Sequence, residues 1–298
     1  MHFTVVLNRD GGTLKTMDVE RFATSVRERL GAAGHTVDMR IVEGAQIIEE
    51  LGRAARGRKS DIVMAGGGDG TISAAAAALA GNRKALAILP AGTMNLFARS
   101  LGIPLALDEA VAAFATGKVI AVDVASANGR VFVHQFSVGL HAKMVHLREK
   151  MNFRSRLGKI RASARAAASA ILNPPILNVT LKIGEAEIEA RTTGIGFTNN
   201  LFGEGHLPYA DSPAGGALGI YVTIAQRPGE VLRFAANLAR GRWTRNDQVE
   251  IHEARNATLT IRSSRGKWRA VIDGELEKLG RETTFEIHPA KLKVLVPA

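Results

Sequence analysis

The chain has 298 residues, of which 46% are hydrophobic and none is cysteine. It can therefore bury a large core, and it excludes disulfides and thiolate metal sites, as expected of a reducing, cytoplasmic compartment. A net charge of +11 predicts anionic partners, but with only 5% aromatic residues we expect no nucleic acid. The longest apolar stretch, 72–80, is too short to span a bilayer.

Strands and helices alternate in the first third of the chain. Short apolar, β-branched runs predict strands, and spacings such as Phe22, Val26 and Leu30 predict helices. Four consecutive strand–helix units predict a parallel sheet covered on both faces, a three-layer α/β domain. The expected strands are 3–8, 35–42, 61–65 and 85–90, and the expected helices are 18–30, 45–56, 71–80 and 94–101.

After Asp123 the pattern changes to closely spaced strands, several of them separated by turns such as Asn128-Gly129, Gly184-Glu185 and Gly266-Lys267. This predicts an all-β, antiparallel β-sandwich domain with two helical insertions, 142–172 and 229–240. The expected strands lie within 131–140, 176–183, 186–197, 218–225, 257–263, 268–272, 283–288 and 291–296. We therefore expect domains at 1–122 and 123–298, with room for 288–298 to pack back on the first.

The string GGGDGT, Gly66 to Thr71, follows a buried strand and precedes a helix. Open α/β sheets bind ligands at this edge, and a helix N-terminus favours phosphate. Asp69 would repel a bare phosphate, so it fits best if Mg²⁺, or a water on Mg²⁺, lies between them. The alternative is a glycine turn in which Asp69 only caps the helix.

The next strand–helix unit repeats the arrangement in PAGTMNLFAR, where Gly92 and Thr93 follow the strand and Asn95 opens the helix. Alone, this string predicts a helix cap. Two adjacent loops of this kind could hold a nucleotide between them.

Together, GGGDGT and PAGTMNLFAR resemble the diacylglycerol kinase catalytic family, which includes sphingoid-base kinases and bacterial lipid kinases. TNNLFGEGHLPYA (198–210), VIDGE (271–275) and Asn8 before Gly11 and Gly12 are similar to further family segments in the same order. The resemblance implies a domain cleft for ATP, Mg²⁺ and a diacylglycerol-like acceptor, and a role in phospholipid biosynthesis. The residues that it implies for ATP are Asn8, Gly66, Gly67, Gly68, Asp69, Gly70, Thr71, Gly92, Thr93 and Asn95.

Phosphoryl transfer needs positioning, charge neutralisation and a base near the accepting hydroxyl. Asp273 and Glu275 would share one face of a strand, about 7 Å apart, so that one could accept the proton while the other binds metal or orients it. The resemblance favours Glu275 as the base, with Asp273 close by and Asp69 controlling the metal. The alternative is an ordinary Asp-Gly hairpin turn.

The sequence departs from the family pattern at Leu96, where aspartate is usual, and at Gly215 and Gly219, which replace two acidic residues. We therefore expect no structural Mg²⁺ in the loop 211–219. The departures leave open a non-catalytic nucleotide- or lipid-binding member. An NAD kinase shares the Gly-Gly-Asp-Gly-Thr logic, but PAGTMNLFAR and the long C-terminal sandwich oppose it.

Residues 143–165 contain eight Lys or Arg and one acid, Glu149, with apolar residues between them. This pattern predicts peripheral contact with an anionic membrane surface, or else a solvated helix face. No H-x-x-x-H motif occurs, so the histidines, His141 and His146 among them, are expected to be structural. Oligomeric state is open, and a homodimer is allowed.

Overall fold

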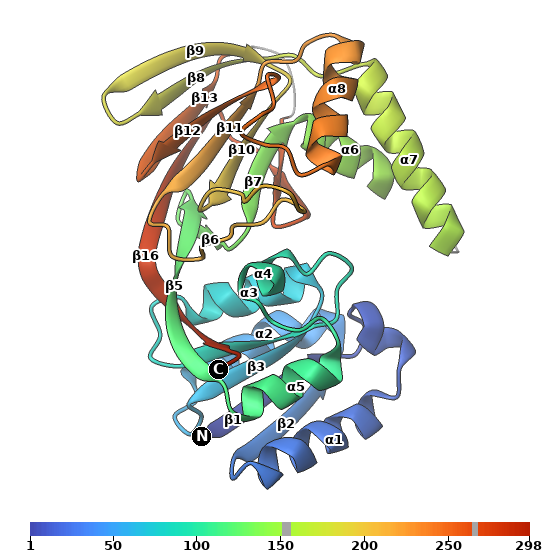
Figure 1. Ribbon diagram of the computed structural model, residues 1–298, viewed down its shortest axis with the longest axis vertical. Coiled ribbons are helices and arrows are strands. Elements are labelled where there is room, and N and C mark those ends of the chain that lie inside the picture. The colour runs from blue at the N-terminus through green and yellow to red at the C-terminus, as the bar shows by residue number, and fades with distance from the viewer. Residues whose placement is uncertain (151–155, 264–267) are drawn as a thin grey trace.

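The computed structural model describes residues 1–150, 156–263 and 268–298. Figure 1 shows an N-terminal α/β part and, above it, a β-rich part that carries three helices on one side. The predicted fold class is confirmed, because a parallel set of strands begins the first sheet and a separate antiparallel sheet lies in the C-terminal part.

The N-terminal part is built on four parallel strands in the order β2-β1-β3-β4, flanked by helices. The strands are β1 (His2–Asn8), β2 (Thr36–Val42), β3 (Ile62–Gly67) and β4 (Ala85–Pro90). The helices are η1 (Gly12–Thr16), α1 (Val19–Ala32), η2 (Gly44–Gln46), α2 (Ile47–Arg56), α3 (Asp69–Leu79), α4 (Leu96–Ser100) and α5 (Leu107–Ala115).

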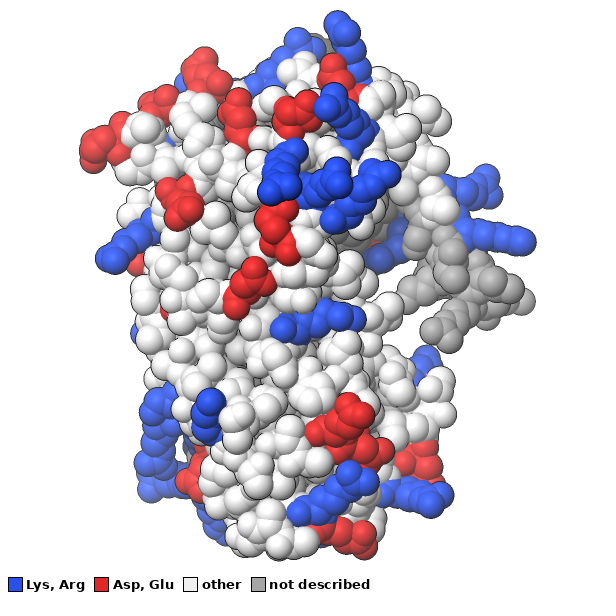
Figure 2. Space-filling view, viewed as in Figure 1, with Lys and Arg blue, Asp and Glu red and all other residues white. Residues whose placement is uncertain are grey.

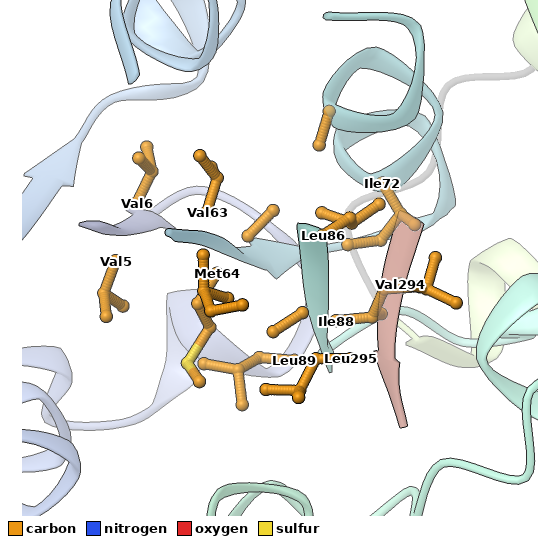
Figure 3. Packing of buried hydrophobic residues seen from close by; sticks show 14 of the residues in the cluster. Val5, Val6, Val63, Met64, Ile72, Leu86, Ile88, Leu89, Val294 and Leu295 are labelled. Carbon is orange, nitrogen blue, oxygen red and sulfur yellow. The ribbon is translucent and has the colours of Figure 1, made fainter. Parts of the chain in front are cut away.

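The core of this part is apolar on both faces of its sheet, as the near-continuous hydrophobic strands predict. Figure 3 shows Val6 and Val63 on one face and Val5 and Met64 on the other. These four side chains are fully or almost fully buried. Because side chains alternate along each strand, helices are needed on both sides of the sheet.

Two long strands, β5 and β16, connect the two parts. β16 (Glu282–Val296) pairs with β13 at its start and runs parallel to β4 at Lys293 and Val294. It replaces the two short strands expected at 283–288 and 291–296, with a register shift between His288 and Leu292. β5 (Lys118–Ala127) pairs with β16. The domain boundary expected between residues 122 and 123 falls inside this strand, so the division into 1–122 and 123–298 stays a proposal.

The β-rich part packs two sheets face to face around Phe136, Phe197 and Phe285, and Phe197 stacks on Phe285 at 3.6 Å between ring centroids. The second sheet has the order β12-β11-β10-β7-β14-β15. Its strands are β7 (Gln135–Gly139), β10 (Gly194–Asn199), β11 (Leu218–Thr223), β12 (Val249–Ala254), β14 (Arg269–Ile272) and β15 (Glu275–Lys278). β6 (Arg130–Phe132), β8 (Leu177–Ile183), β9 (Ala186–Thr192) and β13 (Asn256–Ile261) extend the first sheet.

Three helices accompany the second sheet: α6 (Leu140–Glu149), α7 (Arg156–Leu172) and α8 (Pro228–Ala239). They lie beside one another in Figure 1, and α7 contacts both α6 and α8. Among the described residues, no helix is long and apolar enough to cross a membrane. The expected turn at Gly266-Lys267 lies outside the described residues.

Candidate active site

Three loops converge where β1, β3 and β4 end. The amide of Asn8 donates to the hydroxyl of Thr71 at 3.1 Å, which joins the first loop to α3. Gly12 has φ of 51° and lies so close to Ala91 that an added Cβ would sit 1.8 Å from its carbonyl oxygen. A Cβ on Gly92 would lie 3.0 Å from the Cα of Gly68. The backbones are therefore in direct contact, which only glycine permits at these points.

Asp69 lies in the first turn of α3, but its carboxylate caps a different helix. Its two oxygens accept hydrogen bonds from the backbone N–H groups of Asn95 (3.2 Å) and Leu96 (3.0 Å) at the start of α4. Asn95 is in the left-handed region, with φ of 50°, and α4 therefore begins at Leu96 rather than at Met94 as expected. The alternative, in which Asp69 only caps the helix that follows its loop, is therefore wrong, because α3 has no side-chain cap and Asp69 caps the neighbouring helix instead.

The structure brings the residues expected to bind ATP to one place, but it gives them different tasks. The side chain of Asn95 is bonded to Gly92 N–H and to the carbonyls of Pro90 and Gly92, and Asn8 is bonded to Thr71 and to Asp10 N–H. These amides shape the loops. The groups left to face a ligand are the backbone of Gly68 to Gly70, which opens α3, and the exposed Thr93.

Asp273 is buried and joins the two parts of the molecule. Its carboxylate accepts from the Ser73 hydroxyl on α3 at 2.6 Å and from the N–H groups of Val133, His134 and Gln135 at 2.9 to 3.0 Å. Burial raises the pKa of Asp273, and these four donors oppose that rise by favouring the charged form. Because four donors already occupy its two oxygens, this carboxylate is better suited to holding α3 against the start of β7 than to accepting a proton.

Glu275 is the more accessible of the two carboxylates, with a side chain 61% exposed. A Cβ on Gly70 would lie 2.6 Å from its Oε1, so the carboxylate reaches the first turn of α3. Arg130 lies 3.7 Å away and also pairs with Glu277. Asp69, Asp273 and Glu275 therefore lie near the first turns of α3, and their roles stay a proposal. The expected shared strand face of Asp273 and Glu275 is wrong. Asp273, with φ of 46°, and Gly274 form the hairpin turn between β14 and β15, as in the alternative, and Glu275 begins β15.

A cavity of about 470 Å³ opens at the same place and extends into the β-rich part. Its lining is mainly apolar and comes from the outer face of β7, β10 and β11 and from α6, α7 and α8. Asp69, Asn95 and Leu96 line the end at the loops, and Asp273 and Gly274 lie beside them. Glu275 itself is not part of the lining.

A small polar group interrupts the apolar lining. The Ser137 hydroxyl lies 2.7 Å from Nδ1 of His141, and the Gln135 amide is 3.5 Å from the same nitrogen. Nearby, His134 stacks on Phe202, and its Nε2 has no hydrogen-bond partner among the described residues. The side chains of His134 and His141 are only half-buried because each lines the cavity. The cavity itself is enclosed by protein on several sides, so both rings are largely removed from bulk water.

Burial lowers the pKa of His134 to about 3 and that of His141 to about 4, with smaller contributions from His141 and Arg148 respectively. Both rings are therefore neutral at physiological pH. A neutral pair offers hydrogen bonds without charge, which suits an ester or a hydroxyl better than an ionic group.

These lowered pKa values predict that acid weakens the fold. The unfolded histidines protonate near pH 6.5, whereas the folded ones stay neutral down to about pH 4 and pH 3. Their stabilisation is therefore present above pH 6.5 and is lost as the pH falls through that window. At pH 5 each histidine should lower the free energy of unfolding by about 2 kcal/mol relative to neutral pH.

The measurement is urea unfolding of wild type and His141→Gln at pH 7 and pH 5. The variant should lose less stability between the two pH values, by about 2 kcal/mol. Equal losses in the two proteins would mean that His141 is protonated in the folded state.

The loop at 211–219 shows why acids are missing there. A Cβ on Gly219 would lie 2.5 Å from the Thr198 hydroxyl, and one on Gly215 would lie 2.9 Å from the amide oxygen of Asn200. Asp211 bonds to His206, and Asp123 holds the loop through Gly216 N–H at 2.7 Å. Aspartates at 215 and 219 would not fit this packing, and the expectation of no structural Mg²⁺ there stays a prediction.

The basic segment 143–165 falls partly outside the described residues, so its proposed membrane contact cannot be placed on it. A different basic surface is visible around α8. Figure 2 shows Lys and Arg gathered in the upper half of this face, where Figure 1 places α8. Exposed arginines of this region are Arg227, Arg233, Arg240, Arg242 and Arg245.

Sequence reasoning missed the polar group of the cavity. His141 was expected to be structural, although the run QFSVGLH, from Gln135, alternates polar or small residues with apolar ones. In the structure Gln135 and Ser137 line the cavity, while Phe136 packs in the sandwich core. That alternation was the available signal for a strand with two different faces.

Comparison with known families agrees with this geometry. Residues 2–127 match the family model described as the diacylglycerol kinase catalytic domain. The predicted family resemblance is confirmed. The match covers all three converging loops and ends within β5.

Curated relatives match over shorter segments. A "Probable lipid kinase YegS-like" from Citrobacter koseri is 46% identical over 83 residues, covering 26% of this chain and 28% of that protein. A protein of the same name from Yersinia enterocolitica is 32% identical over 142 residues, covering 46% of each. The matched segments thus span less than half of these relatives.

Solved structures extend the likeness to the whole fold. A diacylglycerol kinase from Bacillus anthracis aligns with a TM-score of 0.74 and 19% identity, covering 99% of this chain and 96% of that one. At this identity the likeness concerns the fold alone.

Proposed function

We propose that this protein is an ATP-dependent lipid kinase that transfers the γ-phosphoryl group to a lipid hydroxyl, with a diacylglycerol-like acceptor. The observation that carries the proposal is the apolar cavity of about 470 Å³ that opens beside Asp69 and Asn95, in the loops that follow β3 and β4. A cavity lined mainly by apolar side chains suits a hydrocarbon chain, and the first turn of a helix suits phosphate. The family match of the loops supports the same reading.

Each carboxylate has a distinct role in this proposal. Glu275 accepts the proton as the O–H bond of the lipid breaks and its oxygen bonds to the γ-phosphorus, while ADP leaves with the bridging oxygen. Asp273 positions α3 against β7 through Ser73 and the backbone. Asp69 holds the two glycine loops in register. The apolar cavity keeps water away from the phosphoryl group.

Mg²⁺ fits this site as an ion that arrives with ATP. Among the described residues there is no group of three or more His, Cys, Asp or Glu that could hold a metal. Asp69 and Glu275 are the carboxylates that would contact it, directly or through water. When bound, it would neutralise phosphate charge.

Asp69→Asn should lower turnover by about 10²-fold or more, because the nucleotide loop loses both charge and shape. The amide keeps one acceptor, but its NH₂ faces an N–H of α4, so stability should fall by about 1–2 kcal/mol. Steady-state turnover and urea unfolding, measured on one preparation, check both effects. Full activity would remove Asp69 from the site.

The surface around α8 supports peripheral contact with an anionic membrane, in the cytoplasmic location that we also propose. Five exposed arginines lie on α8 or in the segments next to it, and Leu232 of this helix is 59% exposed. Basic residues beside exposed apolar ones are typical of helices that lie on a lipid surface. Such contact would place the cavity near its substrate.

ATP consumption measured with a panel of lipids tests the proposal. Turnover that requires a lipid with a free hydroxyl is the expected result. Turnover that requires NAD would instead indicate an NAD kinase. Binding of ATP and lipid without turnover would identify a non-catalytic member of the family.

A further inference from the structure

Gly196 lies in the middle of β10, where nothing in the backbone requires glycine. Its φ is not in the left-handed region. A Cβ added there would meet only the Cβ of Tyr221, at 4.0 Å, which is ordinary contact. Glycine weakens a strand interior and often marks a place where a ligand approaches the backbone.

Other glycines on the same face are explained by packing. A Cβ on Gly194 would lie 3.1 Å from the Val138 carbonyl oxygen, and one on Gly219 would lie 2.5 Å from the Thr198 hydroxyl. Gly196 is the glycine of this face whose side-chain space is open.

The row of residues across the sheet shows what this space adjoins. Gly196 pairs with Ser137 on one side and with Tyr221 on the other, and Ser137 pairs with Val271. Val271 packs against α6 in one apolar cluster, and Tyr221 packs with Trp243 in another. Side chains therefore fill both ends of the row. Between them Gly196 has no side chain, so the backbone of β10 lines the cavity at this point.

The position of the row along the strands gives its depth. Gln135 donates its N–H to Asp273, which is bonded to α3, so the row of Gln135 and Thr198 lies nearest the loops. The Gly196 row is two residues further along, about 7 Å deeper. A lipid whose hydroxyl is at the loops therefore passes Gln135 first and places its chain over Gly196, in the row of Ser137.

We infer that Gly196 determines the length of chain that the cavity accepts, by leaving the backbone of β10 as the floor beneath a single acyl chain. The inference rests on the proposed function for the direction in which the lipid enters. Side chains of increasing size at position 196 would shorten the accessible chain path step by step.

The test measures binding without ATP, so that its outcome is independent of turnover. Trp243 lines the cavity and is one of two tryptophans. In a Trp268→Phe background it becomes the sole tryptophan, which can be excited selectively over the two tyrosines. Monoacylglycerols brominated on the chain, with eight or sixteen carbons, would quench it on binding and yield dissociation constants.

Wild type should bind both probes. Gly196→Ala should have a small effect, whereas Gly196→Val and Gly196→Leu should weaken binding of the sixteen-carbon probe by about tenfold or more and spare the shorter one. Thermal unfolding should show that the variants are at least as stable as wild type, because β10 gains a side chain suited to strands.

Gly31→Leu is the matched control, since a Cβ at this exposed glycine of α1 meets nothing within 4 Å and lies far from the cavity lining. It should leave both dissociation constants unchanged. Equal binding of the long probe by wild type and Gly196→Leu would overturn the inference, as would a failure of wild type to bind either probe. If Gly196→Leu does not fold, the same comparison with Gly196→Val decides. Lipid binding with this dependence on chain length, but without kinase turnover, would contradict the proposed function and leave the inference about Gly196 intact.

Discussion

Glu275→Gln should lower kcat by about 10²–10⁴-fold while leaving ATP binding nearly unchanged. The side chain is exposed, reaches the first turn of α3, and keeps its size and most contacts when the carboxylate becomes an amide. What the variant loses is the ability to accept the proton of the lipid hydroxyl. Single-turnover kinetics with saturating ATP and lipid would isolate this step.

Glu277→Gln provides the matched control. Glu277 lies on the same strand, pairs with the same Arg130, and is two residues farther from the turn. Its variant should retain nearly full turnover. If both variants lose activity equally, the effect arises from Arg130 and the local charge, and Glu275 is not the base.

Asp273→Asn should destabilise the fold by about 3–5 kcal/mol. The carboxylate accepts four hydrogen bonds in a buried site, whereas an amide offers one oxygen and turns an NH₂ group toward N–H donors. Ser73→Ala removes only the bond to α3 and should cost about 1 kcal/mol. Urea unfolding of both variants measures these differences.

The same variants separate two roles for Asp273. If Asp273 holds α3 in place, its replacement should lower stability and activity together. Ser73→Ala should then reproduce part of each effect. An Asp273→Asn protein with wild-type stability and no turnover would contradict this role. That result would instead support Asp273 as the proton acceptor, a role that the sequence alone left open between Asp273 and Glu275.

The parallel strands could be predicted because the sequence encodes them locally. β4 was expected at its observed bounds, since ALAILP is a buried apolar run between turns. β5 and α5 were not expected. KVIAVDVASA follows an alanine-rich segment without a strong turn, and the pairing of β5 with β16 joins residues more than a hundred positions apart.

The candidate site was predictable in its residues but not in their roles. GGGDGT and DGE identify Asp69, Asp273 and Glu275 as candidates, and the resemblance to the family is what indicates that they belong to one site. Only the fold shows that Asp69 caps α4 and that Asp273 is occupied by four donors. The cavity also needs the fold, because β7, β10, β11 and three helices contribute to it from distant segments.

Transfer of label from γ-³²P-ATP to lipid tests the central claim, that the glycine loops and the apolar cavity form one phosphoryl-transfer site. Wild type should move the label into the organic phase only when a hydroxyl-bearing acyl lipid is present, and Glu275→Gln should not. Label that remains in the aqueous phase with every lipid supplied, from a protein that binds both ATP and lipid, would contradict it.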